Sequence, residues 1–290
     1  MATVTPVVML VFNRPDLTEM SFARIREQRP GWLFVVADGP RPDSPDDVAR
    51  CARVREIVAT IDWPCDVQRN YADTNLGLRR RVSSGLDWVF RQVDRAIILE
   101  DDCLPEPDFF RFCDAMLERY ANNPRVSAIT GDNFQGGSRR GTASYYFSKY
   151  PHVWGWATWR RAWTLYDGAM EFWPEWRGSP EWTRAMPDRM ERRYWERIFD
   201  RAAAGVIDSW AYPWTASVWR HGGLTATPNA NLVTNLGYGA EATHTKIGPA
   251  ANPVGSLGPI SHPTEIVADS RADRYAFRHH FGGGFRVVPK

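Results

Sequence analysis

The sequence predicts an α/β fold, in which a Rossmann-like, mostly parallel sheet is flanked by helices and carries a Trp-rich C-terminal cap. In the first half, short apolar runs alternate with amphipathic segments, as in βαβ units. From about Tyr145 onward, Trp, Arg, Pro and Gly replace that clean periodicity. The 290 residues suit one large domain, which we divide into halves at 1–135 and 136–290.

The first predicted strand, Val7–Phe12, is a continuous apolar run that Asn13-Arg14-Pro15 interrupts. A helix should follow and end before Pro30, with Asp16 and Glu19 spaced as in a capping box. Trp32–Ala37 is the second predicted strand, and it stops at the turn Asp38-Gly39-Pro40.

The next strand–helix pairs are shorter or more polar. We expect a helix over Asp46–Thr60, a strand over Asp66–Arg69, and a helix that runs from Asn75-Leu76-Gly77 to about Gln92.

The strand Ala96–Leu99 ends in three consecutive acids, Glu100, Asp101 and Asp102. Three carboxylates at the end of a buried strand repel one another unless a positive charge lies among them. A divalent cation with oxygen ligands is the simplest candidate, and a solvated acidic turn is the alternative.

After the acids we expect a helix over Pro107–Tyr120 and a strand over Val126–Thr130. In the second half, Glu181–Ala204 is the clearest helical segment, and the remainder consists of short pieces and loops.

Composition excludes several classes of protein. A formal net charge of +2 implies no general surface for nucleic acid or other polyanions. The four cysteines show no CxxC pair or zinc pattern, which suits free thiols in a reducing compartment. We see no secretory signal and no stretch as long as a transmembrane helix, so we expect a cytoplasmic protein, with peripheral attachment to the inner membrane as an alternative.

Parallel strands should bring their polar ends to one edge of the sheet. That edge would gather the side chains that follow the strands, namely Asn13, Arg14, Asp38, Asn75, Arg79, Arg80, Arg81 and the three acids. Cations beside a metal site suit a diphosphate, although each cation alone also suits solvent. The sequence has neither a P-loop nor a GxGxxG fingerprint to explain the site otherwise.

Several segments resemble known glycosyltransferases. Residues 97–112, IILEDDCLPEPDFFRF, look like the metal-binding segment of N-acetylglucosaminyltransferase I and related GT-A-fold enzymes. The segments PVVMLVFNRP, ADGP, TNLGL, VWGWATWRRAW and NLVTNLGYGAEATHT are similar to bacterial family-two-like glycosyltransferases. Together these matches extend over most of residues 6–246.

The resemblance implies a metal-dependent enzyme that moves a hexosyl or N-acetylhexosaminyl group from a nucleotide-diphosphate sugar, with UDP expected, to a hydroxyl of a glycan or glycoconjugate in polysaccharide biosynthesis. It implies direct binding of Mn²⁺ or Mg²⁺ by Asp102, with His244 as a second ligand or a diphosphate contact. It implies that further residues bind the donor, namely Phe12, Asn13, Arg14, Asp38, Asn75, Gly77, Arg81, Glu100 and Asp101. Asn231, Asn235 and Gly237 either line the donor site or form structural turns.

We expect inversion at the transferred sugar, with Asp208 as the general base that takes the acceptor proton. The bacterial pattern commonly reads Trp-Asp-Tyr, but this chain has Ala211 after Trp210, and Asp208 lies on the other side of that tryptophan. Partial burial among Trp210 and Tyr212 would favour the role of base, whereas a helix cap or a loop hydrogen bond is the alternative for Asp208.

Trp154 and Trp156 are candidates for stacking on the acceptor sugar, with core packing as the alternative. Two other functions remain open. A sugar nucleotidyltransferase should show a Gly-rich basic loop after the first strand, where this chain has Asn13-Arg14-Pro15. A carbohydrate-binding protein without turnover is the alternative that Ala211 keeps open. The oligomeric state does not follow from the sequence.

Overall fold

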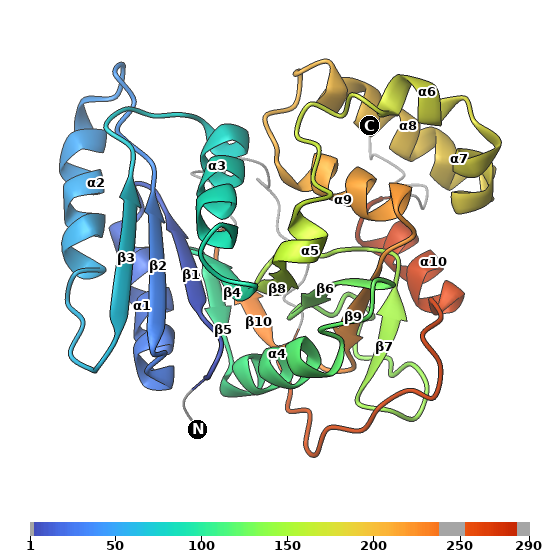
Figure 1. The fold of residues 1–290 in the computed structure, drawn as a ribbon, viewed down its shortest axis with the longest axis horizontal. Helices are drawn as coiled ribbons and strands as arrows, with labels where there is room; N and C mark the ends of the chain where they lie inside the picture. The colour runs from blue at the N-terminus through green and yellow to red at the C-terminus, as the bar shows by residue number, and fades with distance from the viewer. Residues whose placement is uncertain (1–2, 238–252, 283–290) are drawn as a thin grey trace, which may run out of the picture.

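The computed structural model describes residues 3–237 and 253–282. A mixed eight-stranded sheet runs through the chain (Figure 1). β1 (Val7–Val11) lies between β2 (Trp32–Ala37) and β4 (Arg95–Glu100) and is parallel to both. β3 (Asp66–Tyr71) is parallel to β2 at the edge. The carboxyl ends of these four strands therefore meet at one edge of the sheet, as predicted.

The remaining strands extend the sheet in the order β3-β2-β1-β4-β8-β6-β9-β7. β8 (Trp156–Trp159) is antiparallel to both β4 and β6 (Val126–Thr130). β9 (Leu224–Pro228) is parallel to β6, and β7 (Tyr145–Ser148) is antiparallel to β9. Because β4 and β6 both oppose β8, their carboxyl ends lie at the same edge.

Helices cover both faces of the sheet. α1 (Pro15–Gln28), α2 (Pro45–Ile57) and α4 (Pro107–Arg119) pack on the face formed by alternate β1 residues such as Val7 and Met9. α3 (Leu78–Phe90) covers the opposite face, where Val8 and Leu10 point. This alternation explains why the strands are continuous apolar runs, since both faces of each central strand are buried.

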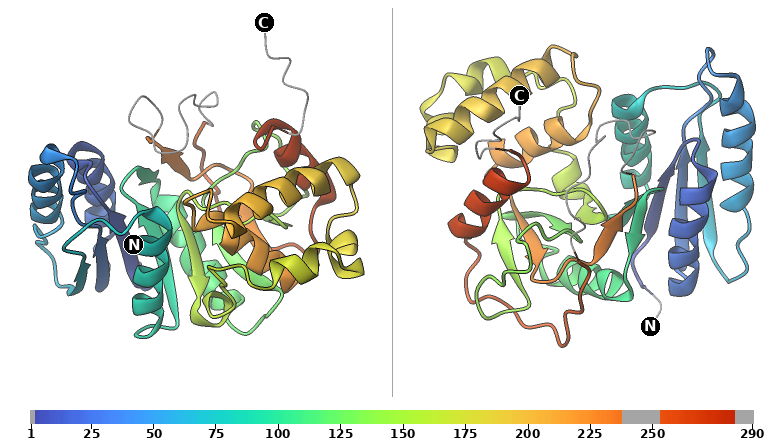
Figure 2. Two further views of the ribbon diagram at one scale, coloured as in Figure 1. Left: turned by 90° about the horizontal axis from the view of Figure 1, so that it is seen from above. Right: turned by 180° about the vertical axis from the view of Figure 1, so that it is seen from behind.

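The second half adds an aromatic cap on the α3 face (Figure 2). Its helices are α5 (Arg160–Trp163), α6 (Trp173–Arg177), α7 (Pro180–Ala185), α8 (Arg189–Ala203), α9 (Ala211–Arg220) and α10 (Ser270–His279). Many of the tryptophans are buried here in one cluster with Trp156, Trp163, Trp173, Trp176, Trp182, Trp195, Trp210, Trp214 and Trp219. Much of the aromatic excess therefore forms a second core.

A small antiparallel sheet links the two halves of the chain. β5 (Cys103–Pro105), directly after the three acids, pairs with β10 (Val233–Asn235). Asn235 lies opposite Cys103, so the end of β10 lies beside the acidic strand end.

Two local predictions were wrong. α1 begins at Pro15, so Arg14 holds the N-cap position and Asp16 lies inside the first turn, where it does not cap the helix. The helix expected over Glu181–Ala204 is divided into α7 and α8, because Pro187 interrupts the backbone hydrogen bonds and Asp188 starts a new, capped helix. No helix in the described ranges is both long and apolar enough to cross a bilayer.

The docking of α10 gives a test of the packing. Asp273 on α10 is buried, accepts a hydrogen bond from the Ser148 hydroxyl at 2.5 Å, and has its pKa raised to about 6 by burial. The folded state therefore keeps a proton that the unfolded chain loses above about pH 4, so the free energy of unfolding falls as the pH rises from 4 to 6. Asp273→Asn removes this dependence on pH, because an amide does not titrate.

In urea titrations, the free energy of unfolding of Asp273→Asn relative to the parent chain should therefore increase by about 2 kcal/mol between pH 4 and 6. A difference that stays constant across this range would contradict the assignment.

Candidate functional site

A pocket of about 310 Å³ opens at the carboxyl ends of β1, β2 and β4. It is lined by the residues that follow these strands and by the start of α3, namely Leu10, Val11, Phe12, Asn13, Arg14, Val36, Asp38, Arg41, Arg50, Asn75, Gly77, Leu78, Arg81, Val82, Glu100, Asp101 and Asp208. All the donor-binding residues predicted from the sequence are in this set. The structure thus gathers segments from five parts of the first half and one residue, Asp208, from the second.

Arg14 is the cation that lies among the three acids. Its guanidinium forms ion pairs with Asp101 and, at 3.0 Å, with Asp102. Burial alone would lower the pKa of Arg14, but the two carboxylates raise it above its ordinary value. Burial and the neighbouring acids raise the pKa of Glu100 to about 8, and burial raises that of Asp101 to about 6 despite Arg14. One guanidinium thus leaves the three carboxylates with excess negative charge.

This excess negative charge fits a metal ion. Asp101 Oδ2 is buried and has no hydrogen-bond partner, so the cluster is not satisfied by the protein groups around it. Among residues 3–237 and 253–282, however, no three His, Cys, Asp or Glu side chains are placed to hold a metal ion together. A cation here would therefore take most of its ligands from elsewhere, such as the oxygens of a bound diphosphate.

Gly237 lies against the Asp102 carboxylate. The Leu236 N–H donates to the Asp102 carbonyl at 2.8 Å, and the Gly237 N–H donates to the Asn235 side chain at 2.8 Å. A Cβ on Gly237 would lie 2.1 Å from Asp102 Oδ2, the oxygen that Arg14 contacts. The close approach of β10 therefore requires glycine and helps to fix the position of Asp102.

Gly237→Ala should displace the Asp102 carboxylate and weaken any binding of Mn²⁺ there by about 10- to 100-fold, as loss of a group that orients a ligand does. Gly178→Ala is the control, because no atom lies within 4 Å of a Cβ at that glycine. Manganese titration by calorimetry in the presence of nucleotide measures the effect. Equal affinities for the two variants would contradict a role for Gly237 in placing Asp102.

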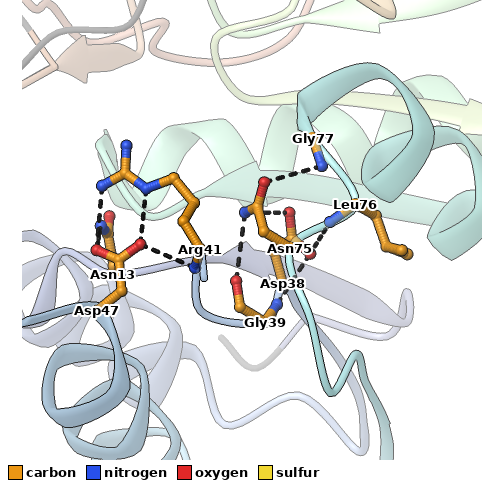
Figure 3. Close-up of polar contacts among 8 residues, drawn as sticks. All are labelled: Asn13, Asp38, Gly39, Arg41, Asp47, Asn75, Leu76 and Gly77. Carbon is orange, nitrogen blue, oxygen red and sulfur yellow. Dashed lines mark hydrogen bonds and ion pairs between the residues drawn. The ribbon is translucent and has the colours of Figure 1, made fainter. Parts of the chain in front are cut away.

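Asp38 ties two loops together at the end of β2 (Figure 3). Its carboxylate accepts hydrogen bonds from the backbone N–H groups of Gly39 and Leu76, both at 2.9 Å, and from Asn75 Nδ2 at 3.0 Å. Burial raises the pKa of Asp38 above its ordinary value. Its first role is therefore to hold the turn before α3, and the same carboxylate borders the pocket.

The Asn13 amide is also held by the protein (Figure 3). Its Nδ2 donates to Asp47 Oδ1 at 2.7 Å, and the Asp47 carboxylate also forms an ion pair with Arg41 at 2.7 Å. The guanidinium of Arg41 lies 5.5 Å from the centre of the Phe12 ring. Our sequence reasoning missed Arg41, which lies in the proline-rich loop, and Asp47 and Arg50, which lie on the predicted helix α2, because neither pattern shows that these segments approach the end of β1.

Arg81 is 7% exposed at the floor of the pocket. It donates to the Asn70 carbonyl at 2.7 Å and to Asn70 Oδ1 at 2.8 Å, while its Nε is buried without a partner. The two arginines that precede it in the sequence, Arg79 and Arg80, have different surroundings. Arg79 donates to carbonyls of the cap, at Gly168 and Ala202, and Arg80 is exposed.

Asp208 joins the cap to the first half. Its two carboxylate oxygens accept hydrogen bonds from the Leu78 and Arg79 backbone N–H groups, both at 3.1 Å. Asp208 therefore does cap α3, as the alternative interpretation predicted. Its side chain is exposed, not buried among aromatic rings as we expected. Each oxygen still has a second lone pair that can face the pocket.

The two predicted stacking tryptophans lie in different surroundings. Trp156 is 1% exposed and stacks on Trp210 with ring centres 5.3 Å apart, so it packs the core and offers no face to a sugar. Trp154 is partly exposed, lies 5.1 Å from the Phe134 ring and donates its backbone N–H to buried Asp132 at 2.9 Å. The sequence reasoning missed Asp132, which stands at the end of β6 on the same sheet edge.

The remaining predicted residues lie in or near β10, or outside the part of the chain that the structure describes. Asn231 and Asn235 form turns at either end of β10, and Asn235 accepts from Gly237. His244 lies outside the described residues, so its predicted role as a metal ligand stays a prediction. The four cysteines are free thiols, as predicted.

Comparisons with known proteins give only weak likenesses. No protein-family model and no curated protein matches the chain. A mannosyltransferase from Pyrobaculum calidifontis, solved with GDP-mannose and Mn²⁺, has 15% identity and a TM-score of 0.38. The match covers 76% of this chain and 69% of the mannosyltransferase.

Two further solved structures are similarly distant. Mouse xyloside xylosyltransferase 1 has 10% identity and a TM-score of 0.37, with 77% of this chain and 84% of its own covered. A cytidylyltransferase from Leptospira borgpetersenii has 12% identity and a TM-score of 0.33, with 57% and 64% covered. Likeness at this level supports no inference about function.

Proposed function

We propose that this chain is a GT-A-type glycosyltransferase that uses a divalent metal and moves a sugar from a nucleotide-diphosphate donor to a hydroxyl of a glycan or glycoconjugate. The observation that carries the proposal is the pocket at the carboxyl ends of β1, β2 and β4. It places an unpartnered arginine nitrogen, two of the three acids, Glu100 and Asp101, and a carboxylate from the cap around one cavity, and Asp102 adjoins this cavity through its ion pair with Arg14.

The pocket has two chemically different ends. At the β2 side, the Asp38 carboxylate and the buried Arg81 Nε–H supply an acceptor and a donor that suit a nucleotide base, with uracil as the expected one. At the β4 side, the acids and Arg14 suit a diphosphate with its cation. Asp102 and His244 would hold the cation, which would stabilise charge on the leaving diphosphate.

Transfer with inversion needs a base on the acceptor side. As the acceptor oxygen bonds to the anomeric carbon, the bond from that carbon to the diphosphate oxygen breaks, and the electron pair leaves with the nucleoside diphosphate. The acceptor proton moves to a carboxylate, and we assign this role to Asp208. Trp154 is the one of the two predicted tryptophans that is not fully buried, and we assign to it the contact with the acceptor sugar.

The two rival functions make different demands on the same pocket. A sugar nucleotidyltransferase must hold pyrophosphate or a nucleoside triphosphate after β1, where the Asn13 amide is already bound to Asp47. A binding protein without turnover needs no base near the acceptor, so the position of Asp208 at the rim of the pocket favours the transferase.

A thermal-shift screen of nucleotide sugars, with and without Mn²⁺, tests the proposal. A ligand present at 100 times its dissociation constant stabilises the folded state by about 2.7 kcal/mol, which raises the melting temperature by a few degrees. We expect such a shift for one nucleotide-diphosphate sugar and only with Mn²⁺. No shift with any donor, or the same shift in the presence of a chelator, would contradict the proposal.

A further inference from the structure

Arginines form a row along the outer face of α8. Arg189, Arg193, Arg197 and Arg201 recur every four residues, so they lie along one side of the helix, and all four are exposed. On α10, Arg271, Arg274 and Arg278 form a second exposed row. The two helices are neighbours, because the rings of Tyr194 and Phe277 lie 5.5 Å apart (Figures 1 and 2).

The acidic side chains of α8 and α10 interact with groups other than these arginines. Glu191 pairs with Lys149 at 2.8 Å, Glu196 accepts from the Trp182 indole, and Asp200 accepts from the Trp173 indole and pairs with Arg177. Asp188 and Asp269 cap the two helices, and Asp273 is buried. Within the ranges that the structure describes, none of the seven arginines forms an ion pair.

The arginine face, defined by these seven residues, stands out on a chain whose net charge is only +2. Apolar side chains are exposed beside it. Met190 in the first turn of α8 is 55% exposed, Val206 just after α8 is 64% exposed, and Val267 just before α10 is 58% exposed. Guanidinium groups together with exposed apolar side chains suit the headgroup region of an anionic bilayer, where both kinds of group find partners.

We propose that the arginine face docks on membrane surfaces rich in anionic phospholipid. The apolar side chains favour a membrane over a nucleic acid, which would leave them in water. The same helices border the acceptor side, because the His280 ring at the end of α10 lies 5.7 Å from the Trp154 ring, and Asp208 lies three residues before the start of α9, which packs on α8. Docking would bring an acceptor carried by a membrane to that side; only this last point depends on the proposed function.

Sedimentation with vesicles tests the docking without any measurement of turnover. The full chain should bind vesicles of phosphatidylcholine mixed with phosphatidylglycerol and not vesicles of phosphatidylcholine alone, and added salt should weaken binding. The triple variant Arg193→Gln, Arg197→Gln, Arg274→Gln should bind about a hundredfold more weakly, since each arginine near an anionic leaflet contributes roughly fivefold.

A matched triple variant provides the control. Arg69→Gln, Arg91→Gln and Arg125→Gln remove the same charge from exposed sites outside α8 and α10 and should leave vesicle binding nearly unchanged. If both triple variants lost vesicle binding equally, net charge alone would explain the loss, and the proposal would be overturned. So would equal binding to both kinds of vesicle, or binding to duplex DNA without binding to vesicles.

Discussion

Asp208→Asn should turn over about two to four powers of ten more slowly than the parent chain, while it binds the nucleotide-sugar donor almost as tightly. An amide cannot take the acceptor proton, but its oxygen can still accept one of the two N–H bonds at the start of α3. The donor is held by the first half of the chain, so its dissociation constant should change little. Single-turnover kinetics and calorimetry measure the two quantities separately.

Because Asp208 also caps α3, its variant needs a control for loss of a cap. Asp188 caps α8 through hydrogen bonds from Met190 and Glu191 and does not line the pocket. Asp188→Ala should therefore lower stability by about 1 kcal/mol and leave turnover nearly unchanged. Parallel losses of donor affinity and turnover in Asp208→Asn would make Asp208 a structural cap, and full activity would move the base to Asp167, Glu171 or Glu241.

Asp102→Ala should abolish Mn²⁺-dependent binding of the donor. The substitution removes the carboxylate that we assign to the metal and leaves Arg14 with Asp101 as its partner, so the fold should persist. Without the cation, the two phosphate groups of the donor would face the remaining acids, and repulsion between like charges would oppose binding. Calorimetry with the nucleotide sugar, with and without a chelator, measures the effect.

Asp114→Ala is the matched control. This carboxylate accepts hydrogen bonds from Thr3 and Thr5, but it lies on α4, outside the row of three acids, and forms no ion pair with Arg14. Donor affinity that is unchanged in Asp102→Ala, or reduced equally in Asp114→Ala, would contradict the metal assignment.

The parallel part of the sheet and its polar edge could be predicted because each signal is local. Runs such as Val7–Val11 are apolar on both faces, and the residues directly after a strand must lie at its carboxyl end. From the strand ends alone, Arg14, Asp38 and Glu100 could be assigned to one edge, and they do line one pocket.

What could not be predicted depends on contacts between distant segments. Trp154 and Trp156 are two residues apart, yet the first lies at the sheet edge and the second lies within the core of the cap, which depends on how α9 packs. The hydrogen bonds of Asp208 to the start of α3 join residues about 130 apart, and Gly237 approaches Asp102 only because β10 pairs with β5. No periodicity in the sequence encodes such contacts.

The most direct test of the proposed function is to follow a nucleotide sugar by phosphorus NMR with the full chain, Mn²⁺, pyrophosphate and a glycan acceptor. A glycosyltransferase converts the donor to nucleoside diphosphate, and this product should appear in the parent chain and be nearly absent with Asp102→Ala. Formation of nucleoside triphosphate and sugar 1-phosphate would instead show a nucleotidyltransferase. A bound donor that stays intact would show a carbohydrate-binding protein, and either result would contradict the function proposed here.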